Sequence, residues 1–401
     1  MKSNLALFRS KPSSIAAVAL SLCALASTPA IVNADAPSTQ PIFTTETHKP
    51  DYHPHIQLAI LLDTSNSMDG LIDQARNQLW RVVDEFSKAR RNGHPVSLEV
   101  AVFEYGNSGL AAKSGHIRKV IGLTGDLDRV SEALFSLTTS GGDEYCGQVI
   151  SQATRQLQWS HVENDIRAIF IAGNEPFTQG PVPYREAVAQ AKAAGIVVNT
   201  IHAGSYDEGR DSGWQDGALL AGGDYMSIDH NLKIAHVPAP QDQRIAELNQ
   251  ALNETYIPYG KQGRAGKQRQ LKQDANTLSI SPALLAKRAK SKAGSLYSND
   301  QWDLVDATRN DKSALQNLDE SELPAEMNGM NPQQRETYVS NKAAERIRIK
   351  QEIAELGKAR DRFIAEAKKQ AATAQEATVD DALVSSIRKQ GKEKHYRFGD
   401  E

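Results

Sequence analysis

Apolar runs of strand length alternate with helical patterns over residues 56–258. The run from Ile56 to Leu62 is almost continuously apolar, which is typical of a strand buried on both faces. Residues 72–86 then carry apolar side chains three and four positions apart, the spacing of an amphipathic helix. Further strands are expected at residues 96–104, 117–123, 166–171, 196–201 and 225–228, with helices between them. This alternation predicts an α/β fold, built on a mainly parallel sheet that is covered on both faces.

The pattern changes after Pro258, where strand patterns disappear. The sequence Asn331-Pro332-Gln333-Gln334 predicts a helix start, with Asn as the cap, Pro in the first turn and Gln reaching back. Apolar residues in the segment that follows, to about residue 377, recur three and four apart. This helix either forms a short coiled coil or docks on the α/β domain. We therefore expect a helical C-terminal region over residues 259–401, with a mildly basic, solvated tail at residues 388–397.

The N-terminus has the features of an export signal. Three basic residues precede an apolar stretch from Ile15 to about Ala26, which is shorter than the ~20 residues of a membrane-spanning helix. Small residues then predict cleavage after Ala34, with Ala36 as the competing site. We expect a signal peptide at residues 1–34 and a linker at 35–54. The mature protein would then be exported, either to a periplasm or out of the cell, without stable membrane insertion.

Composition narrows the function classes further. Hydrophobic residues make up 40% and charged residues 24%, as in an ordinary globular protein. The net charge of −3 and the 6% aromatic content argue against a nucleic-acid-binding surface. Two cysteines cannot build a disulfide framework, and Cys146 is expected to be a buried, inert thiol.

The most informative motif is Asp63-Thr64-Ser65-Asn66-Ser67, where the first strand ends and its helix begins. Ligands of open α/β sheets bind at the carboxyl ends of the strands, so the motif lies where a site is expected. One carboxylate and two hydroxyls are hard oxygen ligands, suited to Mg²⁺, Mn²⁺ or Ca²⁺. Alternatively, Ser65 or Ser67 would simply cap the helix that follows.

In this context the motif resembles the metal-ion-dependent adhesion site of von Willebrand factor type A (VWA) domains, in their exported bacterial branch. The resemblance covers roughly residues 56–258 and implies a Rossmann-like, six-stranded sheet between helices, with one antiparallel edge strand. It implies a divalent cation held directly by Ser65 and Ser67, and by Asp63 through water. It also implies that an acidic residue of a partner protein completes the coordination.

The other two loops depart from the family pattern. The second loop, residues 138–145, places Glu144 where the family often has Thr, with Thr139 as the alternative. The third loop reads Ala172-Gly173-Asn174-Glu175-Pro176, so that Gly173 stands at the usual Asp position. If the cation is bound, its further ligand is Asp143 or Glu144, with Asn174 or Glu175 supporting it through water. Glu104, at the end of the second strand, could join the site or pair with a basic neighbour.

These residues predict a binding protein and not an enzyme. The chain contains neither Gly-x-Ser-x-Gly nor His-Glu-x-x-His, so hydrolase and zincin mechanisms lack their central motifs. The favoured function is divalent-cation-dependent protein binding in a bacterial cell envelope, with no catalytic residue. One alternative is a metal-independent scaffold that acts through the C-terminal helices. A Mg²⁺-dependent phosphohydrolase is the more remote alternative.

Overall fold

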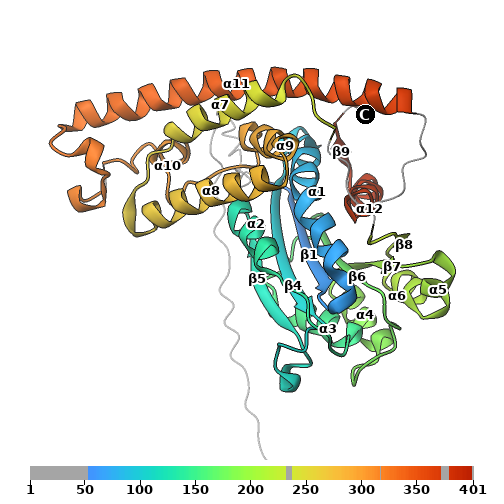
Figure 1. The fold of residues 1–401 in the computed structure, drawn as a ribbon. Coiled ribbons are helices and arrows are strands. Elements are labelled where there is room, and N and C mark those ends of the chain that lie inside the picture. The colour runs from blue at the N-terminus through green and yellow to red at the C-terminus, as the bar shows by residue number, and fades with distance from the viewer. Residues whose placement is uncertain (1–52, 232–236, 317, 372–378, 400–401) are drawn as a thin grey trace, which may run out of the picture. The chain divides into compact units, whose positions relative to one another are not determined.

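The computed structural model describes residues 53–231, 237–316, 318–371 and 379–399. The predicted signal peptide and most of the linker therefore lie outside the described residues. A six-stranded sheet forms the centre, in the order β5-β4-β1-β6-β7-β8, and only the edge strand β5 is antiparallel to its neighbour (Figure 1). The expected α/β fold with one antiparallel edge strand is confirmed. The strands are β1 (His55–Asp63), β4 (Ser97–Tyr105), β5 (Arg118–Thr124), β6 (Ile166–Gly173), β7 (Val197–Ala203) and β8 (Tyr225–Ile228).

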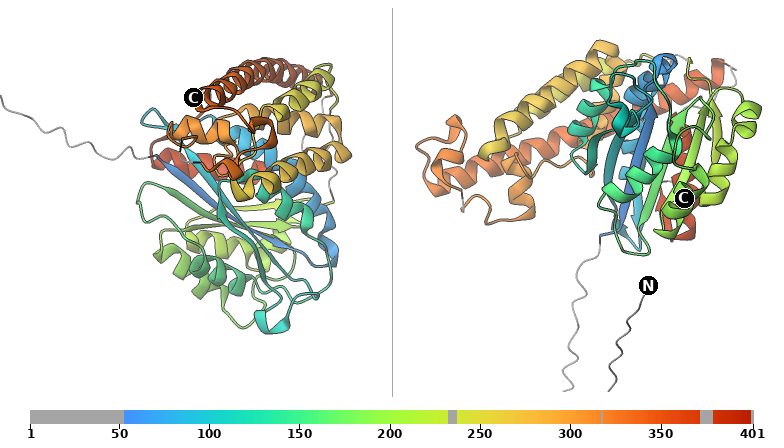
Figure 2. Two further views of the ribbon diagram at one scale, coloured as in Figure 1. Left: turned by 90° about the vertical axis from the view of Figure 1, so that its left-hand side faces the viewer. Right: turned by 90° about the horizontal axis from the view of Figure 1, so that it is seen from below.

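Each face of the sheet is covered by helices, and each has its own apolar core (Figure 2). Successive side chains of a strand point to opposite faces, so β1 contributes Leu58 and Leu62 to one core and Leu61 to the other. This explains why β1 reads as an unbroken apolar run. One face packs against α1 (Asp69–Ser87), α2 (Leu127–Ser136) and α12 (Val379–Glu393). The other packs against α3 (Cys146–Gln156), α4 (Tyr184–Ala193) and α6 (Trp214–Ala221).

The region after residue 258 is helical, as expected, and it continues the core of the α/β domain. Its long helix α11 (Pro332–Ala371) contacts α7 (Asp242–Glu254) and α9 (Pro282–Ala293). Ile349 and Ile353 of α11 belong to the same apolar cluster as β1. Within this chain α11 is thus a docked helix, one of the two alternatives left open by its sequence. The remaining elements are η1 (Asn66–Met68), η2 (Ala112–Ser114), α5 (Tyr206–Asp211), α8 (Gly260–Ile280), α10 (Leu304–Asn310), η3 (Glu320–Glu322) and η4 (Ala325–Met327).

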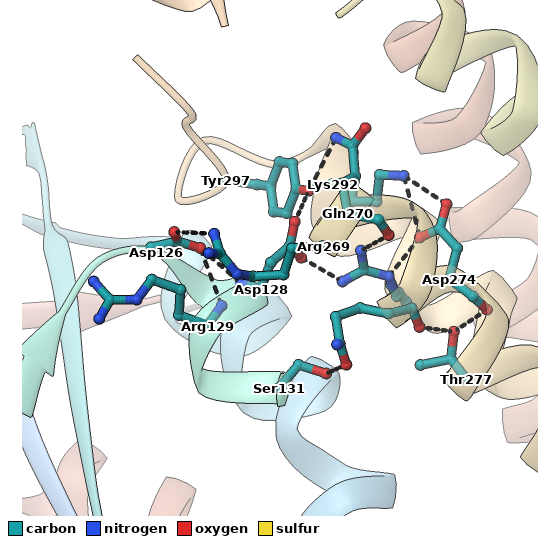
Figure 3. Close-up of polar contacts among 12 residues, drawn as sticks. Asp126, Asp128, Arg129, Ser131, Arg269, Gln270, Asp274, Thr277, Lys292 and Tyr297 are labelled. Carbon is teal, nitrogen blue, oxygen red and sulfur yellow. Dashed lines mark hydrogen bonds and ion pairs between the residues drawn. The ribbon is translucent and has the colours of Figure 1, made fainter. Parts of the chain in front are cut away.

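Buried charges also join the C-terminal helices to the sheet domain. Arg288 of α9 bonds to Asp128 of α2 at 2.8 Å and to Asp274 of α8 at 2.6 Å. Lys292 lies 3.0 Å from Asp274, and the Tyr297 hydroxyl donates to Asp128 at 2.6 Å (Figure 3). Burial alone would raise the pKa of Asp274, but Lys292 and Arg288 outweigh it and lower that pKa. The domain boundary at residue 258 remains a prediction, but the two regions share both a core and this ionic network.

Residues 388–397 do not form the tail that we expected, but the end of a helix and a short strand, although half of their side chains are exposed. Residues 379–393 form α12, which packs against α1, β6 and β7. After it, β9 (Tyr396–Phe398) joins a small sheet with β2 (Ala89–Arg91) and β3 (His94–Pro95). Tyr396 and Phe398 are buried because alternate residues of β9 face the core. Among the described residues, none of the helices combines the length and apolar character needed to cross a membrane.

Candidate metal-binding site

The loop after β1 holds two polar atoms that lack hydrogen-bond partners. Asp63, at the end of the strand, is fully buried, and its Oδ1 accepts the Ser65 N–H at 2.8 Å. Its other oxygen, Oδ2, and the Oγ of Ser65 are buried without a hydrogen bond. The loop is held by backbone hydrogen bonds from Thr64 N to Tyr105 O and from Ser140 N to Thr64 O. These two oxygens are thus fixed in place, and their unmet hydrogen-bonding capacity suits a ligand.

The second loop brings a carboxylate to Asp63. A Cβ on Gly106 would lie 2.7 Å from Asp63 Oδ1 and 2.8 Å from Glu144 Cγ, so both side chains reach the same point. Gly106 has φ +77°, a conformation that other residues rarely adopt. Glu144 is 7% exposed, and its N–H donates to the Gln179 side chain at 3.3 Å. Glu144 is therefore the second-loop residue that the structure places beside Asp63.

The two alternatives from the second loop have other partners. Asp143 is exposed and accepts a hydrogen bond from the Tyr145 hydroxyl at 3.0 Å. The Thr139 hydroxyl donates to Asp69 Oδ1, in the first turn of α1, at 2.6 Å. Thr139 thus lies beside the first turn of α1, and its hydroxyl is engaged by Asp69.

The third loop supports Ser67 and contributes a further negative charge. The amide of Asn174 donates to the Ser67 hydroxyl at 3.3 Å, while Asn174 Oδ1 is buried without a partner. Glu175 is partly buried and accepts a hydrogen bond from Gln179 at 3.3 Å. Gln179 therefore binds both Glu175 and the backbone of Glu144, and it ties the second and third loops together.

Gly173 leaves room for Tyr105 and not for a carboxylate. A Cβ at residue 173 would lie 2.5 Å from the Tyr105 hydroxyl and 3.1 Å from Asp63 Oδ2. The Tyr105 hydroxyl donates to Ala172 O at 3.0 Å, and the buried Cys146 thiol lies behind it at 3.9 Å. Burial raises the pKa of Cys146, which agrees with the expectation of an inert thiol. The departure from the family pattern thus has a steric cause in Tyr105.

Burial dominates the electrostatics of the site. It raises the pKa of Asp63 to about 7, and the charge of Glu175 adds to the rise. Burial likewise raises the pKa of Glu144 to about 7, with further contributions from Asp63 and Glu175. The Ser65 hydroxyl lies close enough to both carboxyls to lower each pKa, although neither contact has the geometry of a regular hydrogen bond. Three acidic groups therefore lie together in a poorly solvated place, where a cation would relieve both desolvation and repulsion.

Of the two roles expected for Glu104, the structure shows the pairing with a basic neighbour. It forms an ion pair with Arg118 of β5 and accepts the Thr64 hydroxyl at 3.4 Å. Burial raises its pKa, while Arg118 acts to lower it. Glu104 therefore supports the loop through Thr64, and its charge is balanced by Arg118.

Four residues of the site carried little signal in the sequence. Gly106 and Tyr105 follow a predicted strand, but only the folded chain shows that one makes room and the other fills it. Gln179 and Arg118 lie far from the motif along the chain. Among the described residues, no group of three or more His, Cys, Asp or Glu has the arrangement of a metal centre. The candidate site instead combines the Asp63 and Glu144 carboxylates with the hydroxyls of Ser65 and Ser67.

Comparison with known proteins agrees with this fold. Residues 57–210 match the model of the von Willebrand factor type A domain. This range includes all the site residues described above. No curated protein sequence matches the chain at a significant level.

The chain is similar to several solved structures, and each similarity covers less than half of its residues. Proximal thread matrix protein 1 from the mussel byssus is 15% identical over 43% of this chain and 41% of its own, with a TM-score of 0.33. The same mussel protein with a zinc-occupied MIDAS motif is 14% identical over 44% of this chain and 42% of its own, with a TM-score of 0.34. The conserved hypothetical protein BatB from Bacteroides thetaiotaomicron is 19% identical over 43% of this chain and 90% of its own, with a TM-score of 0.33. This chain thus spans about two fifths of the mussel protein.

Proposed function

We propose that this chain, in which residues 57–210 form a von Willebrand factor type A domain, binds a divalent cation and through it an acidic residue of a partner protein. The proposed ligands are Ser65, Ser67, Asp63 and Glu144. One observation carries the proposal: Asp63 Oδ2 and Ser65 Oγ are buried without partners beside a second buried carboxylate. A buried polar group of a native protein usually has a partner, which can be an ordered water or an ion.

The donor set favours a hard cation. Carboxylate and hydroxyl oxygens suit Mg²⁺, Mn²⁺ or Ca²⁺, whereas soft metals prefer thiolate or imidazole. When bound, the cation would supply positive charge and an open coordination position for a carboxylate. Glu144 carries a negative charge where the related domains often have a neutral Thr. It would favour retention of the cation but leave the cation less attractive to a partner's carboxylate.

The side chains around the site support a binding role. The ring nitrogens of His202, at the end of β7, lie 3.1 and 3.2 Å from the carbonyl oxygens of Ser205 and Asn174, so the N–H of the ring donates to one of these carbonyls in either tautomer. Cys146 is fully buried behind Tyr105. We therefore assign no catalytic residue. The export-type N-terminal sequence supports a location in the periplasm or outside the cell.

A display selection tests the proposal with the full mature chain. A random peptide library is panned on the protein in Mg²⁺ or Mn²⁺ and eluted with EDTA, in parallel with Asp63→Ala. We expect peptides with Asp or Glu to be enriched on the wild type alone. Cation-independent enrichment, or equal enrichment on Asp63→Ala, would contradict the proposal.

The scaffold alternative has one observation in its favour. Ile347 and Phe363 of α11 are 59% and 42% exposed, so this helix offers apolar surface to a partner. The same selection distinguishes the alternatives. Peptides bound through α11 would resist EDTA and be lost in Ile347→Ser, whereas peptides bound through the cation would be unaffected by that substitution.

A further inference from the structure

A basic groove lies at the opposite end of the sheet from the candidate metal site. Its volume is about 820 Å³, and it opens between the end of α1, the end of α12 and the small sheet β3-β2-β9. The Tyr396 hydroxyl hydrogen-bonds to the carbonyl of His55, where β1 begins. Asp63 ends the same nine-residue strand, so roughly 25 Å of strand separates the two places.

Every ionisable side chain in the groove lining, apart from the buried Tyr396, is basic or a histidine. The basic residues are Lys88, Arg90, Lys392, His395 and Arg397, and none of the lining residues is Asp or Glu. The chain as a whole has a net charge of −3, so this concentration of positive charge is local. A groove of this kind attracts anions at low and moderate ionic strength.

Ordinary structural roles account for the two lysines. Lys88 and Lys392 lie at the C-terminal ends of α1 and α12, where a positive charge interacts favourably with the helix dipole. Lys88 also lies 3.4 Å from Asp84 and 3.9 Å from Glu85. Neither lysine by itself therefore indicates a ligand.

The two arginines are different, because they face each other across the strands. Arg90 of β2 and Arg397 of β9 are directly paired in the antiparallel register, and both are exposed. Directly opposite residues have Cβ atoms about 4.5–5.5 Å apart, and like charges in this position destabilise a sheet. Arg90 donates through Nη1 to the carbonyls of Ser87 and Ala89, and the described residues offer no carboxylate to Arg397. The fold thus places two exposed arginines at directly opposite positions of neighbouring strands, and no ion pair with a carboxylate is found for either among the described residues.

We propose that this groove binds a ligand with clustered phosphate groups, which lies between Arg90 and Arg397. A phosphate monoester carries about −1.5 to −2 charges and three acceptor oxygens, enough for two guanidinium groups at once. A single carboxylate carries one charge on two oxygens, so it matches the pair less well. The volume of the groove exceeds that of one phosphate group and accommodates neighbouring groups beside Lys88, Lys392 and His395.

Calorimetric titration of the full mature chain with tripolyphosphate tests this site. EDTA is present, and Asp63→Ala is titrated in parallel, so that the candidate metal site does not contribute. We expect binding with one-to-one stoichiometry that is weakened roughly tenfold or more in Arg397→Gln and in Arg90→Gln. Arg348→Gln, at an exposed position of α11, is the matched control and should bind as the wild type does. Citrate should bind more weakly than tripolyphosphate.

A second measurement separates a binding role from a structural one. Without ligand and at low salt, Arg397→Gln should raise the unfolding temperature by about 1–2 °C, because it removes the like-charge pair. Loss of binding together with loss of stability would overturn the proposal. So would equal affinity of Arg397→Gln and wild type, or equal affinity for citrate and tripolyphosphate.

Two acidic residues of the chain, Asp400 and Glu401, are the competing occupant. Asp400 and Glu401 follow Gly399, which lines the groove. A chain that ends at Gly399 should bind tripolyphosphate at least as tightly as the full chain. Binding that requires this deletion would assign the groove to the chain's own carboxylates and overturn the proposal.

Discussion

At the scale of single residues, the candidate site depends on which side chains crowd around Asp63. The motif Asp63-x-Ser65-x-Ser67 could be recognised in the sequence because its three oxygens follow a strand within five positions. Glu144 was one of two alternatives to a family threonine, and the folded chain places it beside Asp63. The roles of Tyr105 and Gly106 could not be predicted, since they depend on distances between separate strands.

The buried carboxyls should make the cation-free protein less stable as the pH rises. Asp63 has an ordinary pKa near 3.8 when unfolded and a pKa of about 7 when folded. A raised pKa in the fold means that its stabilising contribution is full below pH 4 and is lost as the pH passes 7. We expect the free energy of unfolding in EDTA to fall by on the order of 2 kcal/mol between pH 5 and pH 8.

Urea unfolding at several pH values measures this effect. Asp63→Asn, which cannot ionise, should show a smaller slope than the wild type over the same range. Saturating Mg²⁺ should also reduce the slope, because the cation stabilises the ionised form. If the free energy of unfolding had the same pH dependence in the wild type and in Asp63→Asn, ionisation of Asp63 would not destabilise the fold, and the prediction would be wrong.

An aspartate at residue 173, the type that the resemblance to VWA domains leads us to expect there, should be destabilising. A Cβ there would lie 2.5 Å from the Tyr105 hydroxyl, well inside contact distance. We expect Gly173→Asp to cost about 1–3 kcal/mol in EDTA, as over-packing does in other cores. Tyr105→Phe removes the obstructing oxygen, so the double variant should lose less stability than the two single changes added together. Strict additivity would show that the hydroxyl does not exclude the aspartate.

At the scale of elements, the sequence predicted a helix or strand wherever its apolar residues kept one regular spacing over several positions. The six sheet strands and the start of α11 are confirmed. Asn331 and Gln334 bond to each other's backbone N–H at 2.9 Å, which is the predicted cap. The helix α8 falls within the region predicted to be helical, but its bounds could not be predicted because glycine and polar residues hide its period. It packs through buried polar groups such as Gln270 and Asp274. The strand β9 was missed because three residues carry too little pattern, and its partner β2 lies about 300 positions earlier.

The helix α12 should be part of the main cooperative unit, because it packs on α1 and on the sheet. Ile387 is fully buried in the core that contains β1. We expect Ile387→Ala to lower the global free energy of unfolding by about 2–5 kcal/mol, through lost burial and the cavity that remains. Val384→Ala, on the same helix at a partly buried position, should cost clearly less. Hydrogen exchange that shows α12 opening alone, with unchanged global stability, would contradict this assignment.

At the scale of the molecule, the helical region and the α/β domain are joined by groups that sequence reasoning could not pair. Asp128, Asp274 and Arg288 come from three helices, and the first is about 150 positions from the others. In the sequence they read as ordinary surface charges. In the fold Arg288 and Lys292 are completely buried, so their charges must be balanced inside. Burial lowers the pKa of Lys292 to about 8, even beside Asp274.

Removal of Asp274 should therefore unfold more than a local contact. Asp274→Ala leaves Arg288 and Lys292 buried with one carboxylate fewer, and we expect a loss of about 3–5 kcal/mol. The exposed pair of Arg76 with Asp73, at 3.1 Å, provides the control. Asp73→Ala should cost less than about 1 kcal/mol. If Asp274→Ala cost no more than Asp73→Ala in urea unfolding, the network would not hold the two regions together.

The measurement that tests the central claim most directly is thermal unfolding of the mature protein at pH 7.5. The wild type and Asp63→Ala are unfolded in EDTA and then in excess Mg²⁺, Mn²⁺ or Ca²⁺. A cation that binds only the folded state at a hundred times its Kd stabilises by about 2.7 kcal/mol. We predict such a rise in unfolding temperature for the wild type with at least one cation, and none for Asp63→Ala. Equal rises in both proteins, or no rise with any cation, would contradict a metal site at Asp63, Ser65, Ser67 and Glu144.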